Sequence, residues 1–296
     1  MVGAPLAPEG RFAEETIEMV PRARILILAD NAAAREGLRT EHGLSIWVES
    51  GGAKVLFDAG QTSAFAENAA RLGVRVEDAD AIVLSHGHYD HAGGLGAALE
   101  LAPRARLFLH PDALRPRYRR LDAPPHKDLA PSAAVRAAAA RAAGRIVPAT
   151  GPARVAGAIR ATGPIPRETA YEDPGGPFFL DPDCREPDPI AEDQALWLET
   201  PAGVVAVAGC AHAGLVNTLR EIAREARVSE IRAVLGGFHL ASASEERLSK
   251  TVEAIRLLGV RELVPCHCTG EAAAARFREE LPGILRPGGA GAEFLW

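Results

Sequence analysis

The chain has little cysteine, no long apolar run and no dense block of basic residues, and each shortage excludes a class of protein. Four cysteines in 296 residues are too few for a disulfide-built scaffold. No apolar run is long enough to span a membrane, so we expect no membrane partner. Lysine and arginine are dispersed and the net charge is -6, so nucleic acid is not an expected partner.

The composition that remains is that of a folded, reduced protein. Hydrophobic residues make up 47% of the chain, enough for one large domain or one domain with an insertion. The N-terminal segment lacks a basic region followed by an apolar core, so we expect no signal peptide. Cys266 and Cys268 flank His267, which indicates a reduced environment. We therefore expect a cytoplasmic protein, with a homodimer as one option for its assembly.

The chain divides into an extension and one domain. Residues 1–23 are rich in proline, glycine and glutamate and are expected to form an N-terminal extension. Residues 24–296 are expected to form a single domain with an irregular insertion at about 111–190. Long segments of this kind are usually functional lids, although a loose surface insertion is an equal alternative.

Short apolar runs predict most of the secondary structure. Strands are expected over 24–29, 45–49, 53–58, 81–85, 106–109, 195–199, 204–208, 231–235 and 262–265. Helical spacing predicts helices over 65–72, 132–143, 216–226 and 248–258, the last capped by Ser242. Two strand pairs, each followed by strand–helix alternation, favour an α/β sandwich of two sheets with outer helices.

The most informative segment is the octapeptide that runs from Ser85 to Ala92. Three histidines and one aspartate fall within six residues, directly after an apolar strand. Imidazole and carboxylate groups are ligands of zinc, iron and manganese. His86 and His88 can face one metal because alternate residues point the same way, while Asp90 and His91 face a second. The alternative is a polar loop that holds histidines by chance.

Three later strands also run into loops with metal-competent residues. These residues are Cys210 and His212, then His239, then Cys266, His267 and Cys268. Ligands gather where strands end, so four such loops would surround one pocket. Each loop alone is a weak signal, because a lone loop histidine is more often structural. Asp58 also ends a strand, either as a turn residue or as a carboxylate that orients a ligating histidine.

At these residues the chain resembles the metallo-β-lactamase superfamily. Residues 86–91 match the signature loop of that family, residues 57–60 match its preceding aspartate motif, and His267 matches its late histidine. The resemblance covers about 24–270. It implies a metallo-β-lactamase-like αβ/βα sandwich of two mixed sheets, with outer helices and the site at one sheet edge. It also implies two divalent metal ions, with zinc expected first and manganese or iron as alternatives.

Within the superfamily the chain is similar to a narrower group of metal-dependent hydrolases related to 7,8-dihydropterin-6-yl-methyl-4-(β-D-ribofuranosyl)aminobenzene 5′-phosphate synthase. The matching stretches are 41–45, 162–167, 193–196, 209–214 with Asn217, 236–240 and 267–270. The chain departs from the common pattern at Gly209-Cys210, where many members carry a bridging aspartate. Cys210 is either a thiolate ligand in its place or a packed thiol. Many members also carry a histidine near residues 193–194, and His212 is expected to supply that imidazole here.

The resemblance then assigns roles to individual residues. The expected metal ligands are His86, His88, His212, Asp90, His91, His267 and, as an open case, Cys210. Asp90 is also expected to accept a proton in catalysis. His239 either donates to a leaving group, binds a substrate anion or is a structural loop histidine. Arg167 and Thr162 are candidate substrate contacts through the resemblance alone.

Three functions remain open for this site. The first is a hydrolase in which a metal-activated water attacks an ester, amide or phosphoester of a small molecule. The second is a pterin-type synthase or transferase with metal-assisted loss of pyrophosphate, for which residues 115–120 and Arg167 could supply a basic pocket. The third is a di-iron redox or sensor protein, which is ranked last because the sequence has no flavin- or dinucleotide-type glycine motif.

Overall fold

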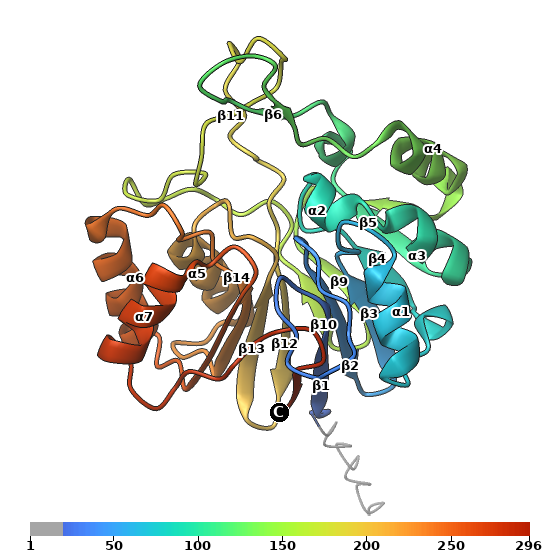
Figure 1. The fold of residues 1–296 in the computed structure, drawn as a ribbon. Coiled ribbons are helices and arrows are strands. Elements are labelled where there is room, and N and C mark those ends of the chain that lie inside the picture. Colours follow the sequence, from blue (N-terminus) through green and yellow to red (C-terminus); the bar gives the residue numbers. More distant parts are fainter. Residues whose placement is uncertain (1–19) are drawn as a thin grey trace, which may run out of the picture.

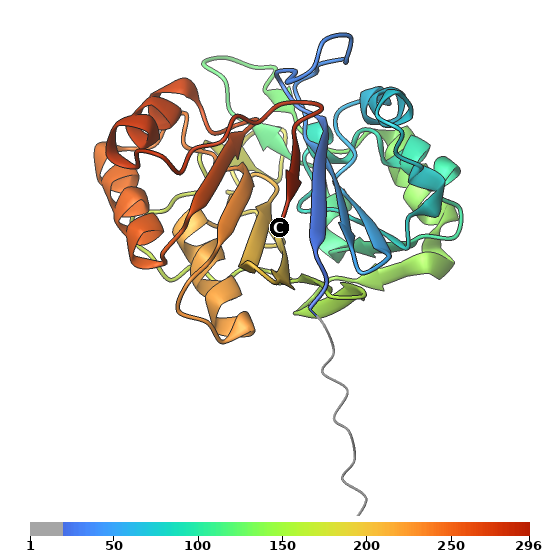
Figure 2. The ribbon, with the colours of Figure 1, turned by 90° about the horizontal axis from the view of Figure 1, so that it is seen from below.

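The computed structural model describes residues 20–296 and shows an α/β sandwich (Figures 1 and 2). Two mixed sheets face each other, and helices cover the outer side of each sheet. This is the fold class that the sequence predicts. The expected extension over 1–23 lies, up to residue 19, outside the described residues.

The first sheet combines an antiparallel part with a parallel part. Its strands, in spatial order, are β16 (Glu293–Leu295), β1 (Ala23–Ala29), β2 (Ser45–Ser50), β3 (Ala53–Phe57), β4 (Ala81–Val83), β5 (Arg106–Leu109) and β8 (Ile146–Pro148). Gly51 and Gly52 join β2 to β3 with φ of 58° and 87°, the left-handed backbone that a two-residue hairpin turn requires. From β3 to β8 the pairing is parallel.

Successive side chains along these strands point to opposite faces of the sheet and pack in two separate hydrophobic cores. Val55 and Phe57 of β3 point to the space between the sheets, while Leu56 points to the outer helices. The outer helices of this half are α1 (Ala64–Arg71), α3 (Leu95–Leu101) and α4 (Ala133–Arg141). A strand buried on both faces reads as a continuous apolar run, which is why the sequence predicts it as a strand without alternation.

The second sheet repeats this plan. Its strands, in spatial order, are β15 (Glu262–Cys266), β14 (Ala233–Gly237), β13 (Gly203–Ala208), β12 (Leu196–Thr200), β10 (Ile159–Ala161) and β9 (Ala153–Ala156). Strands β13, β14 and β15 are parallel, so their carboxyl ends meet at one edge. The outer helices are α5 (Leu215–Ala226), α6 (Glu245–Leu257) and α7 (Glu271–Glu280). Within residues 20–296, no helix has the length and apolar character needed to cross a membrane.

A third, small sheet stands above the end of the sandwich (Figure 1). It pairs β6 (Tyr118–Arg119) with both β7 (Lys127–Asp128) and β11 (Phe178–Phe179). The remaining elements are the short helix α2 (Tyr89–Ala92) and the 3-10 turns η1 (Val76–Asp78), η2 (Pro111–Leu114) and η3 (Ala143–Arg145).

The segment expected to be one irregular insertion at about 111–190 thus divides in two. Its strands β8, β9 and β10 belong to the main sheets, and only the part around the small sheet projects from them. The predicted cap of α6 is wrong by two residues. The side chain of Ser244, not Ser242, accepts the hydrogen bond from Arg247 N, at 3.2 Å.

Candidate metal centre

The predicted site loops meet at one edge of the sandwich. The loop at 85–91 follows β4, the loop at 209–212 follows β13, His239 follows β14 and His267 follows β15. Because parallel strands end at the same edge, this topology brings donors from both sheets together. The structure groups them into four sets of potential metal donors, whose atoms lie within 4.8 Å of one another in each set.

The first donor set consists of His86, His88 and His212, all of which are buried. Burial lowers the pKa of His86 and His212 well below the usual range and that of His88 to about 3. The three imidazoles are therefore neutral, and neutral imidazole is the form that binds a metal.

Hydrogen bonds fix how these rings present their lone pairs. His212 Nδ1 donates to the carbonyl of Pro174 at 2.7 Å, and its buried Nε2 has no hydrogen-bond partner among residues 20–296. Ser85 Oγ accepts from His86 Nδ1 at 2.8 Å, since its own hydrogen goes to Asp58. Within the described part of the chain, Nε2 of His212 is thus without a partner, whereas Nε2 of His86 lies 3.1 Å from Nδ1 of His88. Three imidazoles that bring ring nitrogens this close together fit a three-nitrogen metal site.

The second donor set centres on Asp90. Its Oδ2 lies 3.3 Å from Nε2 of His267, 3.3 Å from Nε2 of His42 and 4.0 Å from Nε2 of His91. Burial would raise the pKa of Asp90, but the hydrogen bond with His267 and the charge of His91 hold it below its usual range. Burial likewise opposes protonation of His267, yet the Asp90 carboxylate raises that pKa to about 9. An environment that favours a proton here also favours a metal cation.

Cys210 lies between the two sets. Its Sγ is 3.0 Å from His91 Nε2, and it also forms a donor set with His86 and His91. A second thiol, Cys268, lies with its Sγ 3.3 Å from that of Cys210, and these two thiols form a set with His239. Burial raises the pKa of Cys210. Burial acts in the same direction on Cys268, but the contacts with Cys210 and His239 lower its pKa well below the usual value.

Asp58 holds the histidine loop in place. Its Oδ2 accepts from His91 Nδ1 at 2.6 Å and from Ser85 Oγ at 2.7 Å, while Oδ1 accepts from Ser85 N at 2.7 Å. Asp58 is fully buried. A carboxylate in this position fixes the tautomer of His91 and leaves its Nε2 directed at the donor sets.

Backbone strain is concentrated at the same loops. Asp58, Ala211, His239 and His267 have φ of 57°, 52°, 45° and 50°, in the left-handed region that non-glycine residues rarely adopt. Such strain persists only where the surrounding structure imposes it, and it is typical of functional sites.

Thr162 and Arg167 lie behind the site and do not line its cavity. Thr162 Oγ1 donates to the carbonyl of Gly163 and accepts from Ala195 N. Arg167 Nη2 donates to the carbonyl of His212 at 2.7 Å. Both side chains are thus hydrogen-bonded to backbone groups, which positions the loops around them, and their contact with substrate stays a prediction.

Asp193, just before β12, contacts the loop that carries His212. Its Oδ2 accepts from Ala213 N at 2.7 Å, and its Oδ1 is buried without a hydrogen-bond partner among the described residues. Burial raises the pKa of this carboxyl to about 7, against the opposing effects of that hydrogen bond and of Arg167.

The donors open into a cavity of about 390 Å³. Its wall includes His42, which the sequence analysis did not single out although it lies in the matching stretch 41–45. The wall also includes Cys268, which the sequence marks as metal-competent and places in the matching stretch 267–270 but which was not among the expected ligands. Tyr89 and Phe178 contribute aromatic surface, and Phe178 comes from the small sheet.

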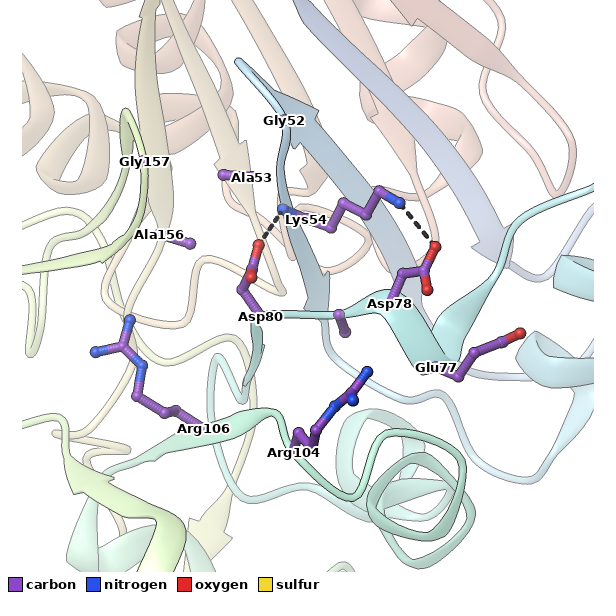
Figure 3. Close-up of a pocket in the computed structure, with 11 residues that line it drawn as sticks. Gly52, Ala53, Lys54, Glu77, Asp78, Asp80, Arg104, Arg106, Ala156 and Gly157 are labelled. Atoms are coloured by element: carbon purple, nitrogen blue, oxygen red, sulfur yellow. Dashed lines mark hydrogen bonds and ion pairs between the residues drawn. The ribbon is translucent and has the colours of Figure 1, made fainter.

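A larger hollow of about 850 Å³ lies at the other end of the first sheet, where β3, β4 and β5 begin (Figure 3). Two of its carboxylates are bound by Lys54: Nζ lies 2.9 Å from Asp78, and the backbone N donates to Asp80 at 2.8 Å. None of the four donor sets found within residues 20–296 lies there. The centre between the strand ends is therefore the candidate active site.

Comparisons with known proteins identify the family of the chain. The family model described as the metallo-beta-lactamase superfamily matches residues 38–267. The chain is 31% identical over 280 residues to 7,8-dihydropterin-6-methyl-4-(beta-D-ribofuranosyl)-aminobenzene-5'-phosphate synthase of Methanocaldococcus jannaschii, covering 89% of this chain and 93% of that protein.

Solved structures show the same relationship. Tm1679, described as a metal-dependent hydrolase of the beta-lactamase superfamily, is 30% identical, with a TM-score of 0.76 over 92% of this chain and 98% of its own. Zn(2+)-bound PqqB from Methylobacterium extorquens shares the fold alone, at 13% identity and a TM-score of 0.54 over 92% of this chain and 99% of its own. With its donor-bearing strand ends and a family match over most of its length, the chain belongs to the metallo-β-lactamase superfamily.

Proposed function

We propose that the protein is a metal-dependent hydrolase that acts on an ester, amide or phosphoester of a small molecule. The observation that carries this proposal is the set of three buried, neutral imidazoles, His86, His88 and His212, beside the Asp90 carboxylate. Three nitrogen ligands that leave one position open are typical of catalytic zinc sites. Two divalent cations, zinc first and manganese or iron as alternatives, would supply an activated water and polarise the bond to be cleaved.

The side chains around the donors provide the remaining chemistry. Asp90 stays a carboxylate because the hydrogen bond with His267 and the charge of His91 hold its pKa below the usual range, so it can hold a metal ion and orient the attacking water by accepting its hydrogen bond. His239 lines the cavity, and Cys268 raises its pKa although burial opposes this, which favours a proton on the ring. We assign His239 the donation of that proton to the leaving group. Asp58 and Arg167 hold the loops of the ligating histidines.

A second candidate is a synthase that joins a pterin to an aminobenzene ribosyl phosphate with loss of pyrophosphate. Two observations favour it: the similarity to the archaeal synthase along most of both chains, and two cationic side chains, Arg119 and Lys127, in the cavity wall. In this reaction the site would stabilise a pyrophosphate leaving group, and no water would attack.

One experiment separates the two candidates. Protein purified without chelator or affinity metal is analysed for zinc, manganese and iron. It is then assayed on a panel of esters and phosphoesters, and separately on a dihydropterin diphosphate with an aminobenzene ribosyl phosphate. Turnover of simple esters, absent in His86→Ala, supports the hydrolase. Release of pyrophosphate only when both pterin and aminobenzene substrates are present supports the synthase and refutes the hydrolase.

A further inference from the structure

The cavity that contains the metal donors is also lined by two cationic side chains. Arg119 of β6 and Lys127 of β7 both line the cavity, and Asp90 is the only carboxylate among its described lining residues. The chain as a whole carries a net charge of -6. The cavity lining thus contains more cationic than acidic side chains, whereas the chain as a whole is acidic.

The two cations face each other directly. Arg119 and Lys127 are partners in the antiparallel register of β6 and β7. Like charges opposite one another destabilise a strand pair, and a bound anion would relieve that repulsion. Lys127 Nζ lies 2.9 Å from the hydroxyl of Tyr89, whereas the Arg119 side chain has no hydrogen bond or ion pair within residues 20–296. One cation is thus positioned and the other is free to bind.

The small sheet that carries them is fixed to the metal loop. Arg117, one residue before β6, is buried and pairs with Asp188 and Glu192 at 2.6 Å each. Glu192 in turn accepts from Gly87 N at 3.2 Å, between the two ligating histidines of the loop.

Two backbone bonds add to this link. Leu129 N donates to the carbonyl of Arg117 at 2.8 Å, and Tyr89 N donates to the carbonyl of Leu129 at 2.9 Å. The distance between the cations and the metal donors is therefore set by the fold.

We propose that Arg119 and Lys127 form a subsite for a phosphate or diphosphate group of the substrate, whose reacting bond lies at the metal donors. This inference rests on the proposed function and narrows its substrate class to phosphorylated small molecules. A planar guanidinium that binds two oxygens, beside a compact ammonium, is the combination that phosphate groups recruit in proteins. Tyr89 and Phe178 line the same cavity and offer aromatic surface to the organic part of such a substrate.

The test measures binding without turnover. Inorganic pyrophosphate is titrated calorimetrically into the zinc-loaded protein and into three variants: Arg119→Met, Lys127→Met and the control Arg115→Met. Arg115 is an exposed cation of the same segment that does not line the cavity. We expect each of the first two variants to weaken binding about tenfold, the usual scale for one charge-assisted hydrogen bond, and the control to bind as the parent does.

The outcomes distinguish this inference from the proposed function. Equal binding by all four proteins would place the anion on the metals alone and overturn the subsite. If the two cavity variants bind weakly while no ester or phosphoester is hydrolysed, the subsite stands and the hydrolase fails. The opposite result is also possible to detect. If a phosphorylated substrate is hydrolysed and its KM is the same in Arg119→Met, Lys127→Met and the parent protein, the hydrolase proposal stands and the subsite is refuted.

Discussion

The substitution Arg117→Met tests whether a buried charge holds the small sheet against the metal loop. The side chains of Arg117, Asp188 and Glu192 are only 1%, 3% and 2% exposed, so water does not screen their interaction. Methionine keeps much of the volume but leaves two buried carboxylates without their cation. Breaking a buried pair in this way costs about 3–5 kcal/mol. The backbone donors Gly87 N and Ile190 N still serve these carboxylates, so we expect the lower end, about 3 kcal/mol.

The assay compares Arg117→Met with Arg119→Met, the same change two residues further on at an exposed position. Thermal unfolding reports a global loss, expected as a fall in Tm of about 6–10 °C. Hydrogen exchange over residues 115–130 reports a local loss, in case the small sheet detaches before the sandwich unfolds. The control should change stability by no more than about 0.5 kcal/mol.

A further variant isolates the cause. When Asp188→Asn and Glu192→Gln are added to Arg117→Met, the uncompensated charges disappear, and most of the stability should return. If Arg117→Met matches the control in both Tm and hydrogen exchange, the ion triad does not anchor the sheet and this reasoning is refuted.

Three other predictions concern the centre itself. His86→Ala should lose bound metal and turnover together; unchanged metal by elemental analysis would contradict the ligand assignment. Cys210→Ser should lower metal content relative to Cys184→Ser, a buried cysteine outside the donor sets, and equal occupancy would show that the thiol does not ligate. In the metal-free protein, folding raises the pKa of Asp193 to about 7, so the folded state holds a proton that the unfolded chain releases above about pH 4. Stability should therefore fall from pH 4 to 7, and urea unfolding of Asp193→Asn should lack that part of the fall.

Much of the sandwich could be predicted because most of its strands are marked by short apolar runs in the sequence. The buried runs at 24–29 and 106–109 coincide within one residue with β1 and β5. Sheet pairing is antiparallel for β1 and parallel for β5, but helices and the second sheet cover both faces of each strand, and continuous apolar runs are the form that such doubly buried strands take. The same strand ends carry the histidines, so the location of the candidate site followed from the local sequence as well.

The remaining features depend on contacts that no local pattern records. The two-residue strands β6 and β7 are too short to show a periodic pattern, and the Arg117–Asp188 ion pair beside them joins residues 71 positions apart. Helix α7 was not predicted because only Ala273 and Phe277 of it are buried, too few for an apolar stripe. The cap of α6 was misplaced because Ser242 with Glu245 matches a capping box, whereas the backbone geometry selects Ser244.

The roles of Thr162 and Arg167 also required the structure. Both lie in a stretch that matches the narrower group, but the resemblance does not say toward which side a residue points. Their hydrogen bonds to backbone groups, such as that from Arg167 to the His212 carbonyl, show which loops they support.

The pairing of β16 with β1 has a consequence for how the molecule is made. Ala23 N donates to the carbonyl of Trp296 at 2.8 Å, and Ile25 pairs with Phe294, so the first sheet receives its outermost strand from the last residues of the chain. Contacts with such a long separation in sequence form slowly, because the closure of a long loop must precede them. During synthesis on the ribosome, the edge of β1 that pairs with β16 therefore stays unpaired until β16 has emerged, and in that interval it is a site for mispairing with other nascent chains.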